Sequence, residues 1–214
     1  MPTKVTSLFY GDPYCRNYVL GEEGEDCILV DFGAPSGRMI LNYVAKHHKK
    51  CLGLLLTHGH FDHICGLQGF ESEIDFPIYM NDFDACCLDD PYLNGSTSFG
   101  LPEVKVDSSK LNLKFLGDAE EIELGGTKIK LIHTPFHTLG SSLFYIEKDG
   151  ILFSGDSLFR YGVGRMDLPH AAPRYFRESA KKIKSLPDAT KAYPGHGPST
   201  TIGDEKRYND YLNS

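Results

Sequence analysis

The residues best suited to do chemistry lie in one short segment, residues 58–63, which reads His-Gly-His-Phe-Asp-His. This segment directly follows an apolar, strand-sized run over residues 52–56 that only Gly53 interrupts. Imidazole nitrogens and carboxylate oxygens are the ligands that zinc, iron and manganese take in proteins. A polar loop without a ligand role is the alternative, but it does not account for this density of ligand types behind a buried strand. The pattern predicts a metal site that uses His58, His60, Asp62 and His63.

Three later segments add side chains of the same kind, each close to the end of a predicted strand. His133 and His137 stand at the end of the strand predicted over residues 127–133, and Asp156 and His196 each follow a glycine after another strand. Loops bent by glycine or proline hold unusual backbone geometry, and binding residues concentrate on such loops. Each signal is weak alone, but together with residues 58–63 they predict a second half of the same site.

A scaffold of strands and helices must position these loops. Apolar patterning predicts strands over residues 5–10, 16–20, 26–31, 52–56, 78–80, 113–115, 120–124, 127–133, 142–147, 151–154 and 190–193. Helices are predicted over residues 37–48, 64–70, 82–88, 173–185 and 202–212, with Ser36 capping the first. Residues 90–109 form a long loop, a length typical of functional lids. The order of elements indicates two sheets with helices packed outside them.

The composition limits the classes of protein. The chain has 214 residues, 41% of them hydrophobic, and a formal net charge of −7, which fits one globular domain. The acidic balance disfavours nucleic acid as a partner. No apolar run approaches the ~18 residues of a membrane span, and no signal-peptide core follows the N-terminus. We therefore expect a cytoplasmic protein without a membrane partner. The six cysteines form no CxxC pair and are expected to be buried small hydrophobes.

The order of motifs, THxHxDH at residues 57–63 followed by His137, Asp156 and a Gly-His pair at 195–196, resembles the metallo-β-lactamase superfamily over essentially the whole chain. The resemblance implies an α/β fold, a four-layer αββα sandwich of two mixed β-sheets with helices outside, in a single domain over residues 1–214. It also implies two divalent metal ions, zinc first, with iron or manganese as alternatives. The first ion would be held by His58, His60 and His137, the second by Asp62, His63 and His196, and Asp156 would bridge both. His133 competes with His137, but the family pattern places the ligand after the proline.

Three stretches resemble short glyoxalase-II-like hydroxyacylglutathione hydrolases: residues 153–159, 162–169 and 194–198. This resemblance implies a thioesterase that cleaves a small-molecule thioester such as S-lactoylglutathione to lactate and glutathione with a metal-bridging hydroxide. Asp62 and Asp156 would be the catalytic carboxylates, and Asp62 would also hold the proton of the hydroxide. Arg165 is expected to bind a substrate carboxylate, with a structural pairing to Asp167 as the alternative. The C-terminal helical glutathione-binding domain of the longer family is not expected.

Two rival functions remain open at this stage. One is a mono-iron persulfide dioxygenase, a sister family with the same motifs, and the other is a non-catalytic metal-binding module. The oligomeric state is left open. Asp31 is expected to orient a metal ligand from behind, His170 to lie on the surface, and Cys65 to pack in a helix.

Overall fold

The first sheet is built from the N-terminal half of the chain. In the computed structural model, which describes residues 3–213, its six strands lie side by side in the order β1 to β6. The pairs from β1 to β3 are antiparallel and those from β3 to β6 are parallel. The strands are Val5–Phe9 (β1), Arg16–Leu20 (β2), Cys27–Val30 (β3), Cys51–Leu55 (β4), Ile78–Met80 (β5) and Leu113–Phe115 (β6).

The second sheet follows along the chain and also has six strands, in the order β12-β11-β10-β9-β8-β7. All of its pairs are antiparallel except β10 with β11, so both sheets are mixed. The strands are Glu121–Leu124 (β7), Thr127–His133 (β8), Ser142–Ile146 (β9), Ile151–Gly155 (β10), Lys191–Pro194 (β11) and Thr200–Thr201 (β12).

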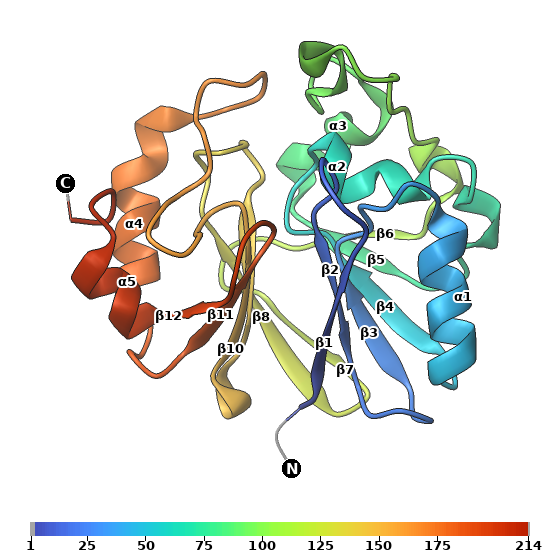
Figure 1. The fold of residues 1–214 in the computed structure, drawn as a ribbon, viewed down its shortest axis with the longest axis horizontal. Helices are drawn as coiled ribbons and strands as arrows, with labels where there is room; N and C mark the ends of the chain where they lie inside the picture. The colour runs from blue at the N-terminus through green and yellow to red at the C-terminus, as the bar shows by residue number, and fades with distance from the viewer. Residues whose placement is uncertain (1–2, 214) are drawn as a thin grey trace.

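Helices cover the outer faces of the two sheets, and Figure 1 shows the resulting four layers. Helix α1 (Gly37–His47) lies outside the first sheet, while α4 (Phe176–Ser185) and α5 (Ile202–Tyr208) lie outside the second. Two short helices, α2 (Phe61–Ile64) and α3 (Ala85–Asp89), lie near the loop end of the first sheet. This arrangement confirms the predicted α/β sandwich. Within residues 3–213, none of the helices combines the length and the apolar character that crossing a bilayer requires.

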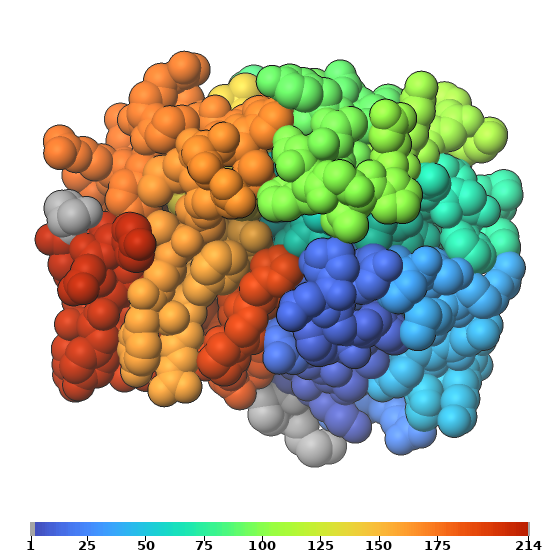
Figure 2. Space-filling view, turned by 45° about the horizontal axis from the view of Figure 1, so that its top comes forward, coloured from blue at the N-terminus to red at the C-terminus, as the bar shows by residue number. Residues whose placement is uncertain are grey.

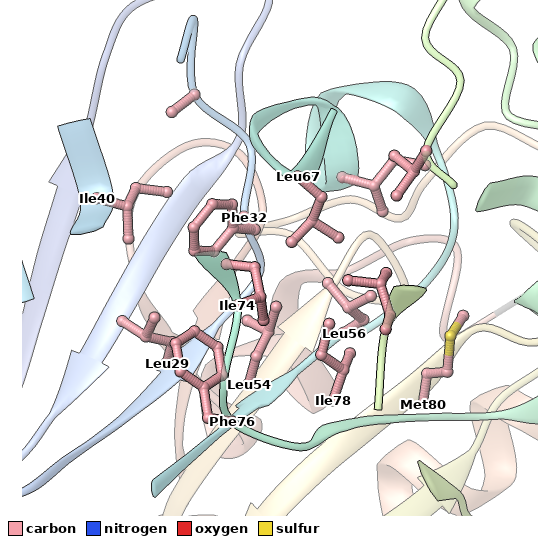
Figure 3. Close-up of a cluster of buried hydrophobic side chains, with 14 of the residues drawn as sticks. Leu29, Phe32, Ile40, Leu54, Leu56, Leu67, Ile74, Phe76, Ile78 and Met80 are labelled. Carbon is pink, nitrogen blue, oxygen red and sulfur yellow. The ribbon is translucent and has the colours of Figure 1, made fainter. Parts of the chain in front are cut away.

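The alternation of side chains along the strands divides the core into three layers. In β3, Ile28 and Val30 join the cluster between the sheets, whereas Cys27 and Leu29 pack on the side of α1. Figure 3 shows the cluster on the α1 side. In β9, Leu143 belongs instead to the cluster that packs under α4 and α5. Full burial of such a side chain stabilises the fold by about 1.5–3 kcal/mol. The three clusters therefore hold the sheet ends, and the loops on them, in fixed positions.

The helix predicted over residues 64–70 is wrong in its position. Helix α2 begins earlier and ends at Ile64, and a 3-10 turn over Cys65–Leu67 follows it. Gly69 has a φ of 80°, a left-handed conformation that a continuous helix does not contain. A Cβ on Gly66 would lie 2.6 Å from the carbonyl oxygen of Phe32, so this segment is shaped by close backbone approach and not by helical propensity.

Two other predictions about helix ends need correction. Ser36 occupies the N-cap position of α1 with extended backbone, but its side chain makes no capping hydrogen bond. The last helix, α5, ends at Tyr208 and does not continue to Leu212. The side chain of Asn209 accepts hydrogen bonds from the backbone N–H groups of residues 211 and 212, and these bonds replace the helical ones.

The loop predicted over residues 90–109 contains two 3-10 turns, Ser96–Phe99 and Ser108–Lys110. The side chain of Asn94 is fully buried and donates to the carbonyl oxygens of Cys87 (3.0 Å) and Val104 (2.8 Å). The segment is therefore tied to α3 and packed on the first sheet.

Candidate metal centre

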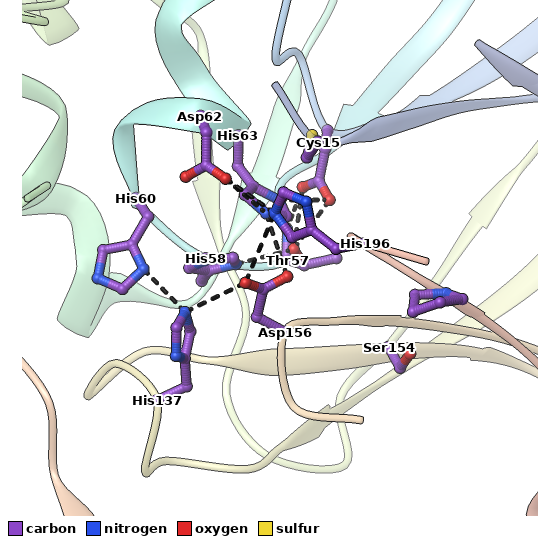
Figure 4. Close-up of polar contacts among 12 residues, drawn as sticks. Cys15, Thr57, His58, His60, Asp62, His63, His137, Ser154, Asp156 and His196 are labelled. Carbon is purple, nitrogen blue, oxygen red and sulfur yellow. Dashed lines mark hydrogen bonds and ion pairs between the residues drawn. The ribbon is translucent and has the colours of Figure 1, made fainter. Parts of the chain in front are cut away.

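Four loops carry the residues that were predicted to bind metal, and Figure 4 shows their side chains pointing toward one another. The first loop joins β4 to α2, and the second joins β8 to β9. The third and fourth follow β10 and β11, which are parallel neighbours, so their carboxyl ends lie at the same edge of the second sheet. The first loop contributes His58 and His60, and helix α2 directly after it contributes Asp62 and His63; the other three loops contribute His137, Asp156 and His196 in that order.

The first group of side chains consists of His58, His60 and His137. All three are buried, and each offers one ring nitrogen that lies within 4.8 Å of the others. Nδ1 of His60 is 2.8 Å from Nε2 of His137. Three imidazole nitrogens converging from two loops form the facial arrangement that a cation with nitrogen ligands needs.

The second group consists of Asp62, His63 and His196, again with one ligand atom each within 4.8 Å of the others. Nε2 of His196 lies 2.9 Å from Oδ2 of Asp62. Asp156 stands between the two groups: Oδ1 is 3.3 Å from Nε2 of His63, and Oδ2 is 3.5 Å from Nε2 of His137. The structure thus brings together all seven residues that the sequence singled out, in two groups that share one carboxylate.

Several of these atoms are buried without a hydrogen-bond partner among the described residues. Those that face the centre are Nε2 of His58, Nε2 of His63 and Oδ1 of Asp156, and Nε2 of His60 is unpaired on the side of its ring opposite His137. Leaving a buried polar atom unpaired costs about 1–3 kcal/mol each, and native proteins rarely contain such clusters without a bound partner. A set of imidazole nitrogens and carboxylate oxygens with unpaired atoms therefore fits divalent cations at this position.

The electrostatics of the metal-free centre divide its histidines: His58 and His60 have lowered pKa values, whereas the nearby carboxylates raise the pKa of His63 and that of His196 despite burial. Burial lowers the pKa of His58 well below its usual value and that of His60 to about 3, so both imidazoles are neutral at pH 7. Burial alone would raise the pKa of Asp62 and of Asp156, but the imidazole of His63 and its neighbours hold both below the usual range. Both carboxylates are therefore ionised.

Asp31 orients part of the centre from behind, as the sequence led us to expect. Its Oδ2 lies 2.9 Å from Nδ1 of His63, which leaves Nε2 of that ring facing the centre. Its Oδ1 accepts a hydrogen bond from the backbone N–H of Thr57 at 2.9 Å, next to His58 in the chain. A carboxylate behind a ligating histidine fixes the ring and raises its basicity. Asp31 has a φ of 57°, unusual for a residue other than glycine.

His137, and not His133, is the residue of its loop that joins the centre. Nδ1 of His137 lies 2.7 Å from the carbonyl oxygen of Arg165, so this ring too is held from behind. His133 turns away, with Nε2 2.8 Å from the carbonyl oxygen of Leu139 and its ring stacked on that of Phe83.

One residue that organises the site had no signal in the sequence. Asp84 is fully buried, and it accepts hydrogen bonds from the backbone N–H groups of Gly59 (2.8 Å) and Gly140 (2.6 Å) and from the hydroxyl of Thr138 (2.7 Å). It thereby holds the loop of His58 and His60 against the loop of His137. The residue lies in a predicted helix, and nothing in its spacing distinguishes it from a solvated carboxylate.

His170 does not lie free on the surface, which corrects the sequence-based expectation. Its side chain is only 13% exposed, and Nε2 lies 3.1 Å from Oδ1 of Asp84 and 2.9 Å from the carbonyl oxygen of Phe83. Its backbone is left-handed, with a φ of 67°. The sequence prediction failed because the inward position of the His170 side chain depends on a left-handed backbone, which residues other than glycine seldom adopt.

A cleft of about 390 Å³ opens above the two groups. Figure 2 shows segments distant in the sequence meeting around it, with the green 85–105 region and the orange 158–170 region on either side. Arg165 lines the cleft, as predicted for a substrate-binding residue. Its guanidinium, however, is paired with Asp167 through two bonds of 2.7 and 2.8 Å, the alternative considered from the sequence. The described lining residues are Pro13, His60, Phe61, Asp62, Phe99, Leu101, His137, Asp156, Phe159, Arg165, Leu168 and His196.

With this fold and this site, the chain belongs to the metallo-beta-lactamase superfamily, whose family model matches residues 11–196. The fold of this superfamily binds metal ions, in agreement with the clusters of histidine and aspartate. Similar proteins include a probable metallo-hydrolase of Bacillus subtilis, 33% identical over 88% of each chain. The hydroxyacylglutathione hydrolase GloC of Haemophilus influenzae is 29% identical over 92% of each chain.

Two solved structures superimpose closely on this chain. The B3 metallo-beta-lactamase BLEG-1 gives a TM-score of 0.86 at 31% identity and covers 99% of this chain and 100% of its own. TTHA1623, solved in a di-iron-bound form, gives a TM-score of 0.82 at 32% identity and covers 96% of this chain and 99% of its own. These similarities show a metallo-hydrolase superfamily without distinguishing between its activities.

Proposed function

We propose that this chain is a hydrolase that uses two divalent cations to cleave acyl thioesters, with S-acylglutathiones as the first candidates. The observation that carries the proposal is the unpaired, buried acceptor atoms of two ligand groups that share Asp156 on the floor of one cleft. The names of the Bacillus subtilis and Haemophilus influenzae relatives support hydrolysis and, for the second, a thioester. His58, His60 and His137 would hold one cation, and Asp62, His63 and His196 the other. Zinc is our first choice of metal, and the same ligands suit iron or manganese.

Divalent cations bound there would supply a water that ionises near pH 7 and a Lewis acid for the substrate oxygen. The chain itself must place the substrate and handle the proton. Asp62 suits the second task because its side chain is 13% exposed beside the cleft and its lowered pKa keeps it ionised. Oδ2 of Asp62 lies 2.9 Å from Nε2 of His196, so the carboxylate that would take the proton stands beside the second ligand group. Asp156 lies between His63 and His137 and contacts both rings, which fixes their positions relative to each other.

A thiol leaving group explains why the reaction needs no dedicated general acid. A thiol has a pKa of about 8.5, so it can depart as a thiolate with little protonation. Among the described residues that line the cleft, Arg165 has the one ionisable side chain other than those of the proposed ligands. A thioester is therefore a better match to this cleft than a substrate whose leaving group has a high pKa.

The proposal is tested by measuring thiol release from S-lactoylglutathione by the metal-loaded protein, in parallel with oxygen uptake on glutathione persulfide. We expect thiol release without oxygen uptake. Oxygen uptake with one iron per chain and no thioester cleavage would instead identify a persulfide dioxygenase. Loss of both activities in protein that still binds metal would identify a non-catalytic metal-binding module.

A further inference from the structure

The apolar side chains that line the cleft above the metal centre include Phe61, Phe99 and Leu101, which we call the apolar wall, and also Phe159 and Leu168 from the second half of the chain. Phe99 and Leu101 remain 46% and 37% exposed, whereas Leu88 in the preceding helix is buried. Water-exposed apolar side chains that face one cleft mark a site whose occupant is apolar. Resting on the proposed thioesterase function, we infer that this wall binds an apolar acyl group and sets the acyl specificity.

The wall is prebuilt and joined to the metal centre. The rings of Phe61 and Phe99 pack with their centres 5.7 Å apart. Phe61 follows His60 in the chain, and its backbone N–H donates to the carbonyl oxygen of Asn94 at 2.9 Å. The buried amide of Asn94 in turn anchors the segment that carries Phe99. An acyl chain on this wall would therefore lie at a fixed distance from the residues that hold the reacting group.

The charges at the rim decide which half of the thioester faces the wall. Among the described residues that line the cleft, Arg165 is the one permanent cation, and its guanidinium is held in a bidentate pair by Asp167. The guanidinium carbon also lies 5.8 Å from the ring centre of Phe99. Glutathione carries two carboxylates, and moving an unpaired charge onto an apolar wall is costly. The acyl group therefore occupies the wall, and the thiol half extends past the rim toward solvent.

The test is a series of glutathione thioesters with acetyl, propionyl, butyryl and hexanoyl groups, with S-lactoylglutathione as a polar match to propionyl. We expect kcat/KM to rise about fourfold for each methylene that reaches the wall, and propionyl to exceed lactoyl. The N-acetylcysteamine thioesters of the same acids should show the same dependence on chain length, because the thiol half does not contact the wall. Binding of the free acids, acetate to hexanoate, to the metal-loaded protein should follow the same order.

Phe99→Ala and Leu101→Ala should each lower the hexanoyl-to-acetyl ratio of kcat/KM by about tenfold, in line with the loss of several buried methylenes. Tyr92→Ala is the matched control: Tyr92 is 62% exposed in the same segment but lies outside the cleft, so its variant should keep the wild-type ratio. Thermal unfolding of each variant checks that it is folded. Thioester cleavage with no dependence on chain length, or a fall in the ratio equal in the control, would overturn the acyl wall and leave the proposed function standing. Failure to cleave any thioester, together with equal binding of all four acids, would overturn both.

Discussion

The imidazole of His170 and the carboxylate of Asp84 form a pair at 3.1 Å beneath the metal centre, where the carboxylate is 1% exposed. Asp84 also accepts from the backbone of Gly59 and Gly140. One carboxylate therefore joins both ligand-bearing loops of the first histidine group to the loop that carries His170 and Arg165. Asp84 is therefore a positioning residue, and changes to either member of the pair should alter the stability of the protein.

Asp84→Ala should lower the free energy of unfolding by about 3–5 kcal/mol, since it leaves the backbone N–H groups of Gly59 and Gly140 buried without an acceptor and removes the carboxylate that pairs with His170. Metal affinity should fall as well, because the loops of His58 and His137 lose their common anchor. Asp82→Ala is the control, because Asp82 is an exposed carboxylate two residues away. Urea unfolding and metal competition measure the two effects. Equal stability of the two variants would show that Asp84 does not hold the loops.

The same pair predicts a dependence of stability on pH. The hydrogen bond to Asp84 raises the pKa of His170 above its usual value, despite partial burial. A raised folded-state pKa contributes stability that is fully present below about pH 6.5 and is lost as the pH rises through the folded-state pKa. His170→Asn tolerates the left-handed backbone but cannot carry the charge. Its loss of stability relative to wild type should be larger at pH 6 than at pH 9. A loss that is independent of pH would mean that the pair is not ionic.

Two glycines in the 162–164 turn offer a steric test of the centre. A Cβ on Gly164 would lie 2.3 Å from the carbonyl oxygen of Asp156 and 2.7 Å from Nδ1 of His137, whereas a Cβ on Gly162 meets nothing closer than 4.0 Å. Gly164→Ala should therefore displace a ligand and lower kcat/KM at least about tenfold, as sub-ångström misplacements do. Gly162→Ala should change kcat/KM less than about twofold. Steady-state kinetics on one thioester compares them, and similar losses in both would argue against ligand placement as the cause.

Variants of Arg165 and Asp167 test whether charge at the rim of the cleft affects substrate binding independently of the apolar wall. The two side chains are 52% and 67% exposed, and pairs of this kind contribute about 0–1 kcal/mol. Because the guanidinium is already paired, Arg165→Ala should change KM for glutathione thioesters less than about threefold. Asp167→Ala frees the guanidinium and should lower KM for these substrates, but not for the uncharged N-acetylcysteamine thioesters. A large rise of KM in Arg165→Ala, confined to glutathione thioesters, would show instead that Arg165 binds a substrate carboxylate.

The sequence predicts the scaffold because strands and helices follow local patterns, and it singles out candidate ligands that the fold brings together. His58, His60 and His63 stand together behind an apolar strand, and the strands themselves follow from alternation that the three core clusters confirm. The long helices α1 and α4 were likewise visible as amphipathic segments, with only their ends displaced.

What the sequence does not predict depends on contacts between distant segments. Asp84 acts on the N–H groups of Gly59 and Gly140, and no spacing rule connects residues that are 25 and 56 positions apart. His170 reaches the interior through a left-handed backbone that its residue type does not suggest. The apolar wall arises because residues 90–109 are anchored by Asn94, whose buried hydrogen bonds are invisible in a polar, loop-like stretch.

A metal titration tests whether two cations held by the seven-residue centre drive thioester hydrolysis. Chelator-treated protein should be inactive on an S-acylglutathione, and activity should return with added zinc, iron or manganese and saturate near two equivalents per chain. Asp156→Asn, which weakens the residue shared by both groups, should fail to recover at the same metal concentration and lose at least about a hundredfold in kcat/KM. Full thioester hydrolysis by the chelated protein, with metal absent by elemental analysis, would show instead that the reaction does not need the two cations.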